Sequence, residues 1–285
     1  NQKREEPLSD TGKSLYSTLL FIVLPQTMAT YLIGDLHGHY SEFERLLIGA
    51  GLCNENLKWS GGTDHLWLMG DFFDRGASGI KCIELTMRLQ QEAQADGGGV
   101  QSLLGNHELM ILCAYQFKER MTDSGGSVFD QWLRWGGIEA DLEGFTEEHA
   151  VWIRTLPAMA LVGDALLIHA DAMMYVNHGT TIERVNNSFF DLMASSDLPA
   201  WEAALSSFSE HMAFSSLAHT GRKRAEQLLS LFGGELLVHG HTPIPYARQI
   251  EAEDVTEAWR YAGDRCLNVD GGMYLGSPGF VHRLH

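Results

Sequence analysis

The chain carries short apolar runs, each followed at once by polar residues. Five of them are YLIGDLHG (31–38), LWLMGDFFDRG (66–76), VQSLLGNHE (100–108), ALLIHAD (165–171) and ELLVHGHTP (235–243). The runs are too short for helices, and continuous apolar runs bounded by glycine are typical of strands buried on both faces. CLNVDGG (266–272) and GFVHRL (279–284) predict two further strands.

Helical patterns lie between these runs. Ser41 and Glu44 form an S-x-x-E capping box, which predicts a helix that begins at Ser41. Apolar spacing predicts further helices over residues 80–94, 146–155 and 222–232. Residues 172–220 carry no strand pattern, and we expect a mostly helical insertion near the functional site there. Strands that alternate with helices predict an α/β fold.

Polar side chains follow five of the predicted strands at their carboxyl ends. Ligands of open α/β sheets bind beyond these ends, so we expect the side chains to converge on one site. They are Asp35, His37, Asp71, Asn106, His107, His169, His239 and His241.

The chemistry of these side chains predicts a metal site. Carboxylate, amide and imidazole donors without thiolate suit Mn²⁺, Fe or Zn²⁺. The two oxygens of Asp71 could bridge two ions, and the neutral carbonyl of Asn106 would limit the negative charge around them. Two ions about 3.5–4 Å apart would clamp the attacking and leaving oxygens of an in-line displacement. We therefore expect two divalent metal ions, manganese first, with the ligands Asp35, His37, Asp71, Asn106, His169 and His241.

Each of these residues also has a purely structural interpretation. A single Gly-Asp after a strand is more often a turn or a helix cap. The occurrence of all the motifs in order, each at a strand end, favours the metal site. His39 lacks that support and is expected at a helix entrance on the surface. Alternation puts His239 on the same side of its strand as His241, and we favour His241 because the preceding glycine lets the backbone come close.

The motifs GDLHG, GDFFDRG, GNHE and GHTP, in this order, resemble those of the metallophosphoesterase superfamily and specifically its phosphoprotein phosphatase branch. The resemblance covers about Thr30 to Gly272, and LNVDGG is similar to the strand that closes the family fold. It implies an α/β fold of the calcineurin-like type, a β-sandwich flanked by helices. It also implies a dinuclear Mn, Fe or Zn centre with the ligand set given above.

The resemblance implies three catalytic roles as well. His107 would be the general acid for the leaving oxygen, and Asp74 would hold it protonated and oriented. Arg75 would grip the phosphoryl oxygens with its planar fork, a geometry that lysine cannot match. The alternative for Asp74 and Arg75 is a helix-capping salt bridge.

The sequence departs from the family pattern in two places. HAD (169–171) stands where many relatives have His-Gly-Gly or His-Ala-Gly, so Asp171 adds a carboxylate near the metals. The usual downstream phosphate-binding arginine has no clear counterpart, and Arg184, Arg222 and Arg224 all stay open.

Asp74 and Glu108 bear on the substrate. Symmetrical diadenosine tetraphosphatases, which MATYLIGD (28–35) and LWLMGD (66–71) also resemble, tend to have Ala-Arg and GNHD at these positions. We therefore expect a phosphomonoesterase acting on phosphorylated protein, Ser/Thr first and Tyr second, or on a small phosphoester. Dinucleoside polyphosphate hydrolysis is the alternative. A non-catalytic phosphate-binding module is a third interpretation, which the His107–Asp74 pair disfavours because a binder needs no proton donor.

The composition limits the kinds of binding partner and the cellular compartment that we expect for this chain. The 285 residues include 37 acids and 20 bases, a net charge of −17, which disfavours a nucleic-acid or anionic-membrane surface. Metal ions can still make an acidic pocket bind phosphate. The four cysteines form no CxxC pair and suit a reducing compartment. The oligomeric state stays open.

Residues 1–27 differ from the rest of the chain. A charged stretch, Asn1 to Lys13, precedes an apolar run from Leu15 to Leu24. The run is about half of the roughly 20 residues that cross a bilayer, and it could be the core of a signal peptide. We favour an unstructured extension, with a metallophosphoesterase domain over residues 28–285 and a cytoplasmic location.

Overall fold

Two β-sheets form the centre of the computed structural model, which describes residues 28–122, 125–215 and 220–284. The predicted N-terminal extension, residues 1–27, lies outside the described residues. The first sheet has the order β3-β2-β1-β9, and β1 is parallel to β2 and antiparallel to β9. Its strands are β1 (Thr30–Ile33), β2 (His65–Leu68), β3 (Gly99–Ser102) and β9 (His282–Leu284).

The second sheet has the order β4-β5-β6-β8-β7. Its three central strands are parallel, and the two edge strands are antiparallel to their neighbours. The strands are β4 (Met159–Val162), β5 (Ala165–Ile168), β6 (Leu236–His239), β7 (Trp259–Tyr261) and β8 (Cys266–Asn268).

The sheets pack face to face as a β-sandwich. Leu32 of β1, Leu167 of β5 and Val238 of β6 belong to one buried cluster that joins the two sheets. Their strand neighbours Ile33 and Leu166 point the other way, into the larger core shared with the helices. Successive residues of a strand face opposite sides, so the continuous apolar runs fill both cores at once.

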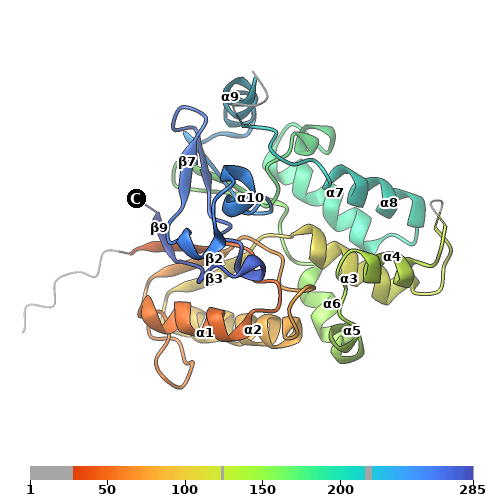
Figure 1. Cartoon of the computed structure of the whole chain (residues 1–285), viewed down its shortest axis with the longest axis horizontal. Coiled ribbons are helices and arrows are strands. Elements are labelled where there is room, and N and C mark those ends of the chain that lie inside the picture. Colours follow the sequence, from red (N-terminus) through yellow and green to blue (C-terminus); the bar gives the residue numbers. More distant parts are fainter. Residues whose placement is uncertain (1–27, 123–124, 216–219, 285) are drawn as a thin grey trace, which may run out of the picture.

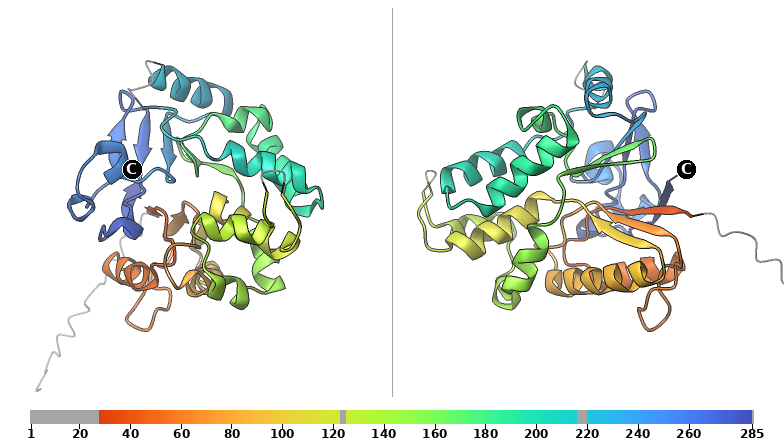
Figure 2. Two further views of the ribbon diagram at one scale, coloured as in Figure 1. Left: turned by 45° about the vertical axis from the view of Figure 1, so that its right-hand side comes forward. Right: turned by 180° about the vertical axis from the view of Figure 1, so that it is seen from behind.

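Helices cover the sandwich. α1 (Tyr40–Gly49) and α2 (Gly79–Ala95) lie side by side along the outer face of the first sheet (Figure 1). α3 (Asn106–Phe117), α4 (Val128–Arg134), α7 (Ile182–Ala194) and α8 (Leu198–Ser207) gather beside the two sheets (Figure 2). The remaining helices are α5 (Glu139–Gly144), α6 (Glu147–Ile153), α9 (Gly221–Phe232) and α10 (Ile244–Arg248), with 3₁₀ turns at Met174–Asn177, Ala252–Asp254 and Met273–Leu275.

The predicted elements agree with the structure apart from a few local differences. All seven predicted strands are present, but the edge strands β4 and β7 were not predicted. The predicted capping box is wrong, because α1 begins at Tyr40 with His39 at its N-cap and no side-chain cap. The stretch 172–220 contains α7 and α8 within its described part. None of the helices in the described ranges combines the length and apolar character that crossing a bilayer requires.

Candidate metal centre and catalytic site

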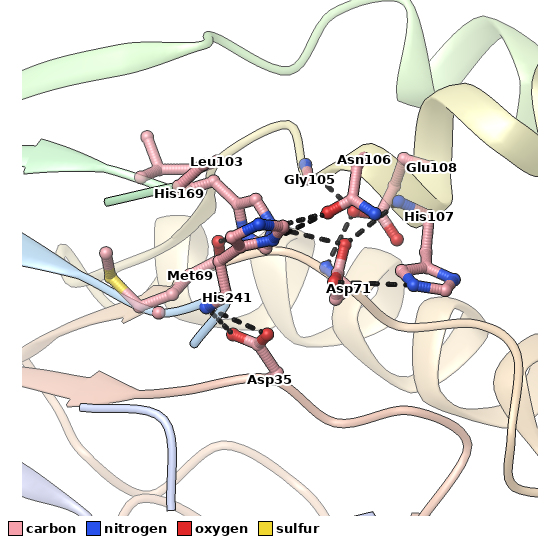
Figure 3. Close-up of polar contacts among 12 residues, drawn as sticks. Asp35, Met69, Asp71, Leu103, Gly105, Asn106, His107, Glu108, His169 and His241 are labelled. Carbon is pink, nitrogen blue, oxygen red and sulfur yellow. Dashed lines mark hydrogen bonds and ion pairs between the residues drawn. The ribbon is translucent and has the colours of Figure 1, made fainter. Parts of the chain in front are cut away.

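The polar residues that follow the strands meet at one edge of the sandwich (Figure 3). Asp35 and His37 follow β1, Asp71 follows β2, His169 follows β5 and His241 follows β6. Asn106 and His107 open helix α3 just after β3. The carboxylates and most of the imidazoles are buried, while Asn106 and His241 are half-buried.

Asp71 occupies the middle of the site. Its Oδ1 lies 3.4 Å from Nε2 of His169, and its Oδ2 lies 3.7 Å from Nε2 of His37 and 4.0 Å from Nε2 of His107. Two groups of three potential ligand residues share this carboxylate. Within each group, the ligand atoms lie within 4.8 Å of one another. One group adds His37 and His107, and the other adds His169 and His241. Asp71 therefore has the position that a bridging ligand requires.

Asn106 and Asp35 complete the set of potential metal ligands. Oδ1 of Asn106 lies 3.0 Å from Nε2 of His169 and 3.0 Å from Nδ1 of His241, so these three atoms face a common point. The Asp35 carboxylate accepts from the backbone N–H of His241 at 3.2 and 3.0 Å. The glycine before His241 is required here, because a Cβ at Gly240 would lie 2.2 Å from Oδ1 of Asp35.

Backbone carbonyls orient two of the histidines. Nδ1 of His169 lies 2.7 Å from the carbonyl of Met69, and Nδ1 of His37 lies 2.9 Å from that of Phe73. A carbonyl can only accept, so Nδ1 of each ring carries a proton, and Nε2 is the nitrogen that remains for a metal ion. Such partners fix the tautomer of a metal-binding histidine.

The site residues also share an uncommon backbone conformation. His37, Asp71, Asp74, Arg75 and His241 have φ values of 43°, 54°, 69°, 69° and 66°. Residues other than glycine adopt this left-handed region at a cost of about 1–2 kcal/mol each. Strain of this kind gathers at functional sites because the surrounding structure holds it in place.

Glu108 provides part of that support. Its buried carboxylate accepts from the backbone N–H groups of Asp71, Phe72 and Gly105 at 2.7, 2.8 and 3.0 Å. Burial, followed by the charge of Asp71, raises the pKa of Glu108 to about 7. Glu108 is not among the cavity-lining residues, so it holds the turn that carries Asp71 rather than contacting a substrate.

His107 forms the expected pair with Asp74. Nδ1 of His107 lies 2.6 Å from Oδ2 of Asp74, and the indole N–H of Trp132 donates to Oδ1 of Asp74 at 3.0 Å. Burial alone would lower the pKa of His107, but the carboxylates of Asp71 and Asp74 outweigh it and the pKa is raised. The two carboxylates therefore favour the protonated form of the imidazole, which is the form that a proton donor needs.

Arg75 is exposed beside this pair. Its guanidinium lies over the ring of Tyr274, 4.3 Å from the centroid, and that ring also meets His37 edge-on at 5.0 Å. The helix-capping alternative does not hold for Asp74 and Arg75. The N-terminus of α2 is instead served by Asp141, which accepts from Ile80 N at 3.2 Å.

The two remaining histidines lie away from this centre. His239 is buried, with Nε2 2.7 Å from the Tyr261 hydroxyl and Nδ1 2.9 Å from the Gly240 carbonyl. Its hydrogen bonds are structural, in agreement with the choice of His241. His39 is half-buried at the N-terminus of α1, 3.8 Å from the Glu42 carboxylate.

A cavity of about 990 Å³ opens from the centre toward α4 and α8. Arg75, Asn106, His107 and His241 line its inner end. Its outer walls are largely apolar and include Met110, Val128, Trp132, Trp135, Leu198 and Phe208.

The predicted candidates for a second phosphate-binding arginine do not line this cavity. Its described lining contains two arginines, Arg75 and Arg134. Arg222 pairs instead with Glu226 at 2.8 Å, and Arg224 donates to the carbonyl of Ala213 at 3.4 Å.

Asp171 and His211 form a third group beside the centre. Asp171 Oδ1 accepts from the Thr242 hydroxyl at 2.5 Å, and its Oδ2 accepts from Met212 N at 2.8 Å. Burial raises the pKa of Asp171 to about 6. His211 was not anticipated, because no motif surrounds it in the sequence. Trp132 and Tyr274 were missed for the same reason.

The donors present fit divalent metal ions. Oxygen and imidazole donors surround Asp71, and no cysteine takes part. Nδ1 of His241, Nε2 of His169 and Oδ1 of Asn106 face one point, and a cation there would be bound by all three atoms. The fold and this donor set together define a site for divalent metal ions at the edge of a β-sandwich.

The chain belongs to the calcineurin-like phosphoesterase family, whose model matches residues 28–245. Over 88 residues, 31% of this chain, it is 40% identical to a symmetrical bis(5'-nucleosyl)-tetraphosphatase of Wigglesworthia glossinidia brevipalpis and covers 27% of that protein. Over 103 residues, 36% of this chain, it is 33% identical to Shewanella-like protein phosphatase 2 of Arabidopsis thaliana and covers 26% of it. The chain thus spans about a quarter of the length of these two relatives.

Solved structures show the same fold. A cold-active protein-tyrosine phosphatase of a psychrophilic Shewanella species superimposes with a TM-score of 0.68 at 20% identity, over 90% of this chain and 75% of that one. A protein serine/threonine phosphatase from Saccharomyces cerevisiae gives a TM-score of 0.55 at 13% identity, over 90% and 72%. The expected calcineurin-like fold is confirmed.

Proposed function

We propose that this protein is a metal-dependent phosphomonoesterase that removes phosphate from phosphorylated protein. One observation carries the proposal. Asp71 is shared between two groups of potential ligands, and the His107–Asp74 pair stands directly beside it. The site combines a place for two cations with a buried proton donor, which phosphoryl transfer to water requires.

The roles of the residues follow from their positions. Asp35, His37 and Asp71 would hold one divalent ion, and Asp71, Asn106, His169 and His241 the other. Bound there, the ions would supply a water of lowered pKa and neutralise phosphoryl charge. We favour manganese, with iron or zinc as alternatives, because the donors are oxygen and nitrogen.

The protein side chains would complete the reaction. Arg75 lines the cavity and would donate two parallel hydrogen bonds to two phosphoryl oxygens. The ring of Tyr274 packs against its guanidinium. His107 would give its Nε2 proton to the leaving oxygen, and the Asp74 carboxylate stabilises the imidazolium before that transfer. A binding module would not require this pair.

Asp74 pairs with the proton donor His107, and its presence favours phosphorylated protein over a dinucleotide as the substrate. The second candidate is dinucleoside polyphosphate hydrolysis, which the names of several relatives favour. We also propose a cytoplasmic location, supported by four buried free cysteines.

The experiment is a turnover panel on purified protein with defined metals, comparing phosphopeptides, small phosphomonoesters and diadenosine tetraphosphate. We expect kcat/KM on a phosphopeptide to exceed that on diadenosine tetraphosphate by at least about tenfold, roughly 1.4 kcal/mol of differential transition-state binding. Faster turnover of diadenosine tetraphosphate than of every monoester would establish the second candidate instead.

A further inference from the structure

Helix α4 ends at a glycine that lies against the turn Asp74–Arg75. The backbone N–H of Gly136 donates to the carbonyl of Leu133 at 3.1 Å, and that of Gly137 donates to the carbonyl of Trp132 at 3.0 Å. This pair of bonds is a Schellman motif, and Gly136 has the positive φ, 98°, that the motif requires after the end of a helix. The motif fixes the backbone of Gly136 and therefore the direction of its carbonyl group.

The carbonyl of Gly136 holds Arg75. It accepts from the backbone N–H of Arg75 at 2.8 Å. A Cβ on Gly136 would lie 3.4 Å from Cγ of Arg75, so the glycine also packs against the first part of that side chain. The preceding residue is held from the same helix, because the indole N–H of Trp132 donates to Asp74 at 3.0 Å. Both residues of the turn are therefore tied to the end of α4.

The turn depends on such support. Asp74 and Arg75 both have a φ of 69°, a left-handed conformation that residues other than glycine adopt at a cost in free energy. A strained turn keeps its shape because its neighbours hold it. The bond from Gly136 acts on the backbone of Arg75 itself, whereas the arginine side chain is exposed. The position of the guanidinium therefore depends on how the backbone of Arg75 is held.

We infer that Gly136 is a positioning residue, whose carbonyl and close packing hold Arg75 in place for the phosphoryl group. This inference rests on the proposed function, in which Arg75 binds the phosphoryl oxygens. Gly136 and Arg75 both line the catalytic cavity, so the support lies where the phosphate would be bound. Gly136 acts through Arg75 rather than through a contact of its own with the phosphate.

Gly97 provides a matched comparison, because it closes α2 with the same motif. Its N–H donates to the carbonyl of Gln94 at 3.2 Å, the N–H of Gly98 donates to that of Ala93 at 2.9 Å, and its φ is 81°. Apart from its chain neighbours, a Cβ on Gly97 would have one described atom within 4 Å, Cγ2 of Thr63 at 3.9 Å. Alanine at this position therefore disturbs the same kind of helix cap without reaching the catalytic residues.

The test measures the binding of inorganic phosphate to manganese-loaded protein by calorimetry, with the manganese content determined on the same samples. An alanine with a φ of 98° is strained, so Gly136→Ala should shift the carbonyl and loosen Arg75. We expect the Kd for phosphate to rise about tenfold, the scale of one hydrogen bond to a charged group, with unchanged manganese content. Gly97→Ala should bind phosphate like the wild type.

A double-mutant cycle shows whether the effect passes through the arginine. In an Arg75→Ala protein, adding Gly136→Ala should change Kd by less than about twofold, because the contact on which both residues act is already lost. Gly136→Asn keeps the comparison available if Gly136→Ala does not fold, since asparagine tolerates a left-handed backbone better than alanine. It should raise Kd in the same direction by a smaller factor.

The inference is overturned if the Gly136 variants bind phosphate as tightly as the wild type, if Gly97→Ala weakens binding equally, or if the loss persists in the Arg75→Ala protein. Weaker binding that only follows a loss of manganese would overturn it as well. Phosphate binding that depends on Gly136 and Arg75, in a protein that turns over no phosphomonoester, would contradict the proposed function and leave the inference standing.

Discussion

The indole N–H of Trp132 and the carboxylate of Asp74 are joined by a hydrogen bond of 3.0 Å, on the oxygen that His107 does not use. Trp132 comes from α4 and Asp74 from the loop after β2, so the bond ties two parts of the chain 58 residues apart. Both Asp74 oxygens are therefore engaged, and the carboxylate cannot rotate away from the imidazole.

Replacing Trp132 with phenylalanine should loosen this arrangement. We expect Trp132→Phe to lower kcat about tenfold on alkyl phosphates, since a hydrogen bond to a charged group contributes about 1.5–3 kcal/mol. Trp135→Phe, on the same cavity wall, is the control and should act mainly on KM. Equal effects of the two variants on kcat would show that the ring, not the hydrogen bond, matters.

His107→Asn should lower turnover by about 10²–10⁴, the usual scale for losing a general acid. The loss should be much smaller on aryl phosphates, because a good leaving oxygen departs without a proton. Asp74→Asn should behave similarly but more mildly. Steady-state kinetics across a series of leaving groups measures this dependence, and a constant loss over the series would remove His107 from the acid role.

The strands, and the meeting of the polar residues that follow them, could be predicted because each signal is local. An apolar run that ends in glycine and a ligand residue carries both the strand and its position relative to the site. The edge strand β7 contains Arg260 and shows no continuous apolar run. The edge strand β4 is an apolar run of four residues, but it is half exposed, with Leu161 at 46%, and was missed. Trp132, Tyr274 and His211 reach the site from distant elements, and only tertiary packing brings them there.

Glu108 illustrates a second limit of prediction from the sequence. Its place in the GNHE motif indicated importance, but the sequence could not distinguish a substrate contact from a backbone clamp. Three backbone N–H groups converge on its carboxylate only because the turn after β2 lies against the N-terminus of α3. Its value as a marker of substrate class is therefore indirect.

Asp141 should make stability depend on pH. Burial raises its pKa to about 6, above the ordinary 3.8, so the folded state holds the proton more tightly than the unfolded state. Its contribution to stability is complete below about pH 4 and is lost as pH rises through about 6. Relative to Asp141→Asn, the wild type should lose roughly 2–3 kcal/mol of unfolding free energy between pH 4 and 7.

Denaturant unfolding of both metal-free proteins at several pH values provides the measurement. Asp191→Asn, at an exposed position on α7, is the matched control and should follow the wild type throughout. Parallel curves for the wild type and Asp141→Asn would contradict the raised pKa of Asp141.

The dependence of turnover on bound metal tests the two-ion centre around Asp71 most directly. The measurement is phosphomonoester turnover by chelator-treated protein during titration with Mn²⁺, with metal content followed in parallel. We expect no turnover without metal, a rise that saturates at about two ions per chain, and impaired binding of the second ion in Asp71→Asn, because a neutral amide bridges two cations poorly. Full turnover by metal-free protein, or wild-type metal content in Asp71→Asn, would contradict this account.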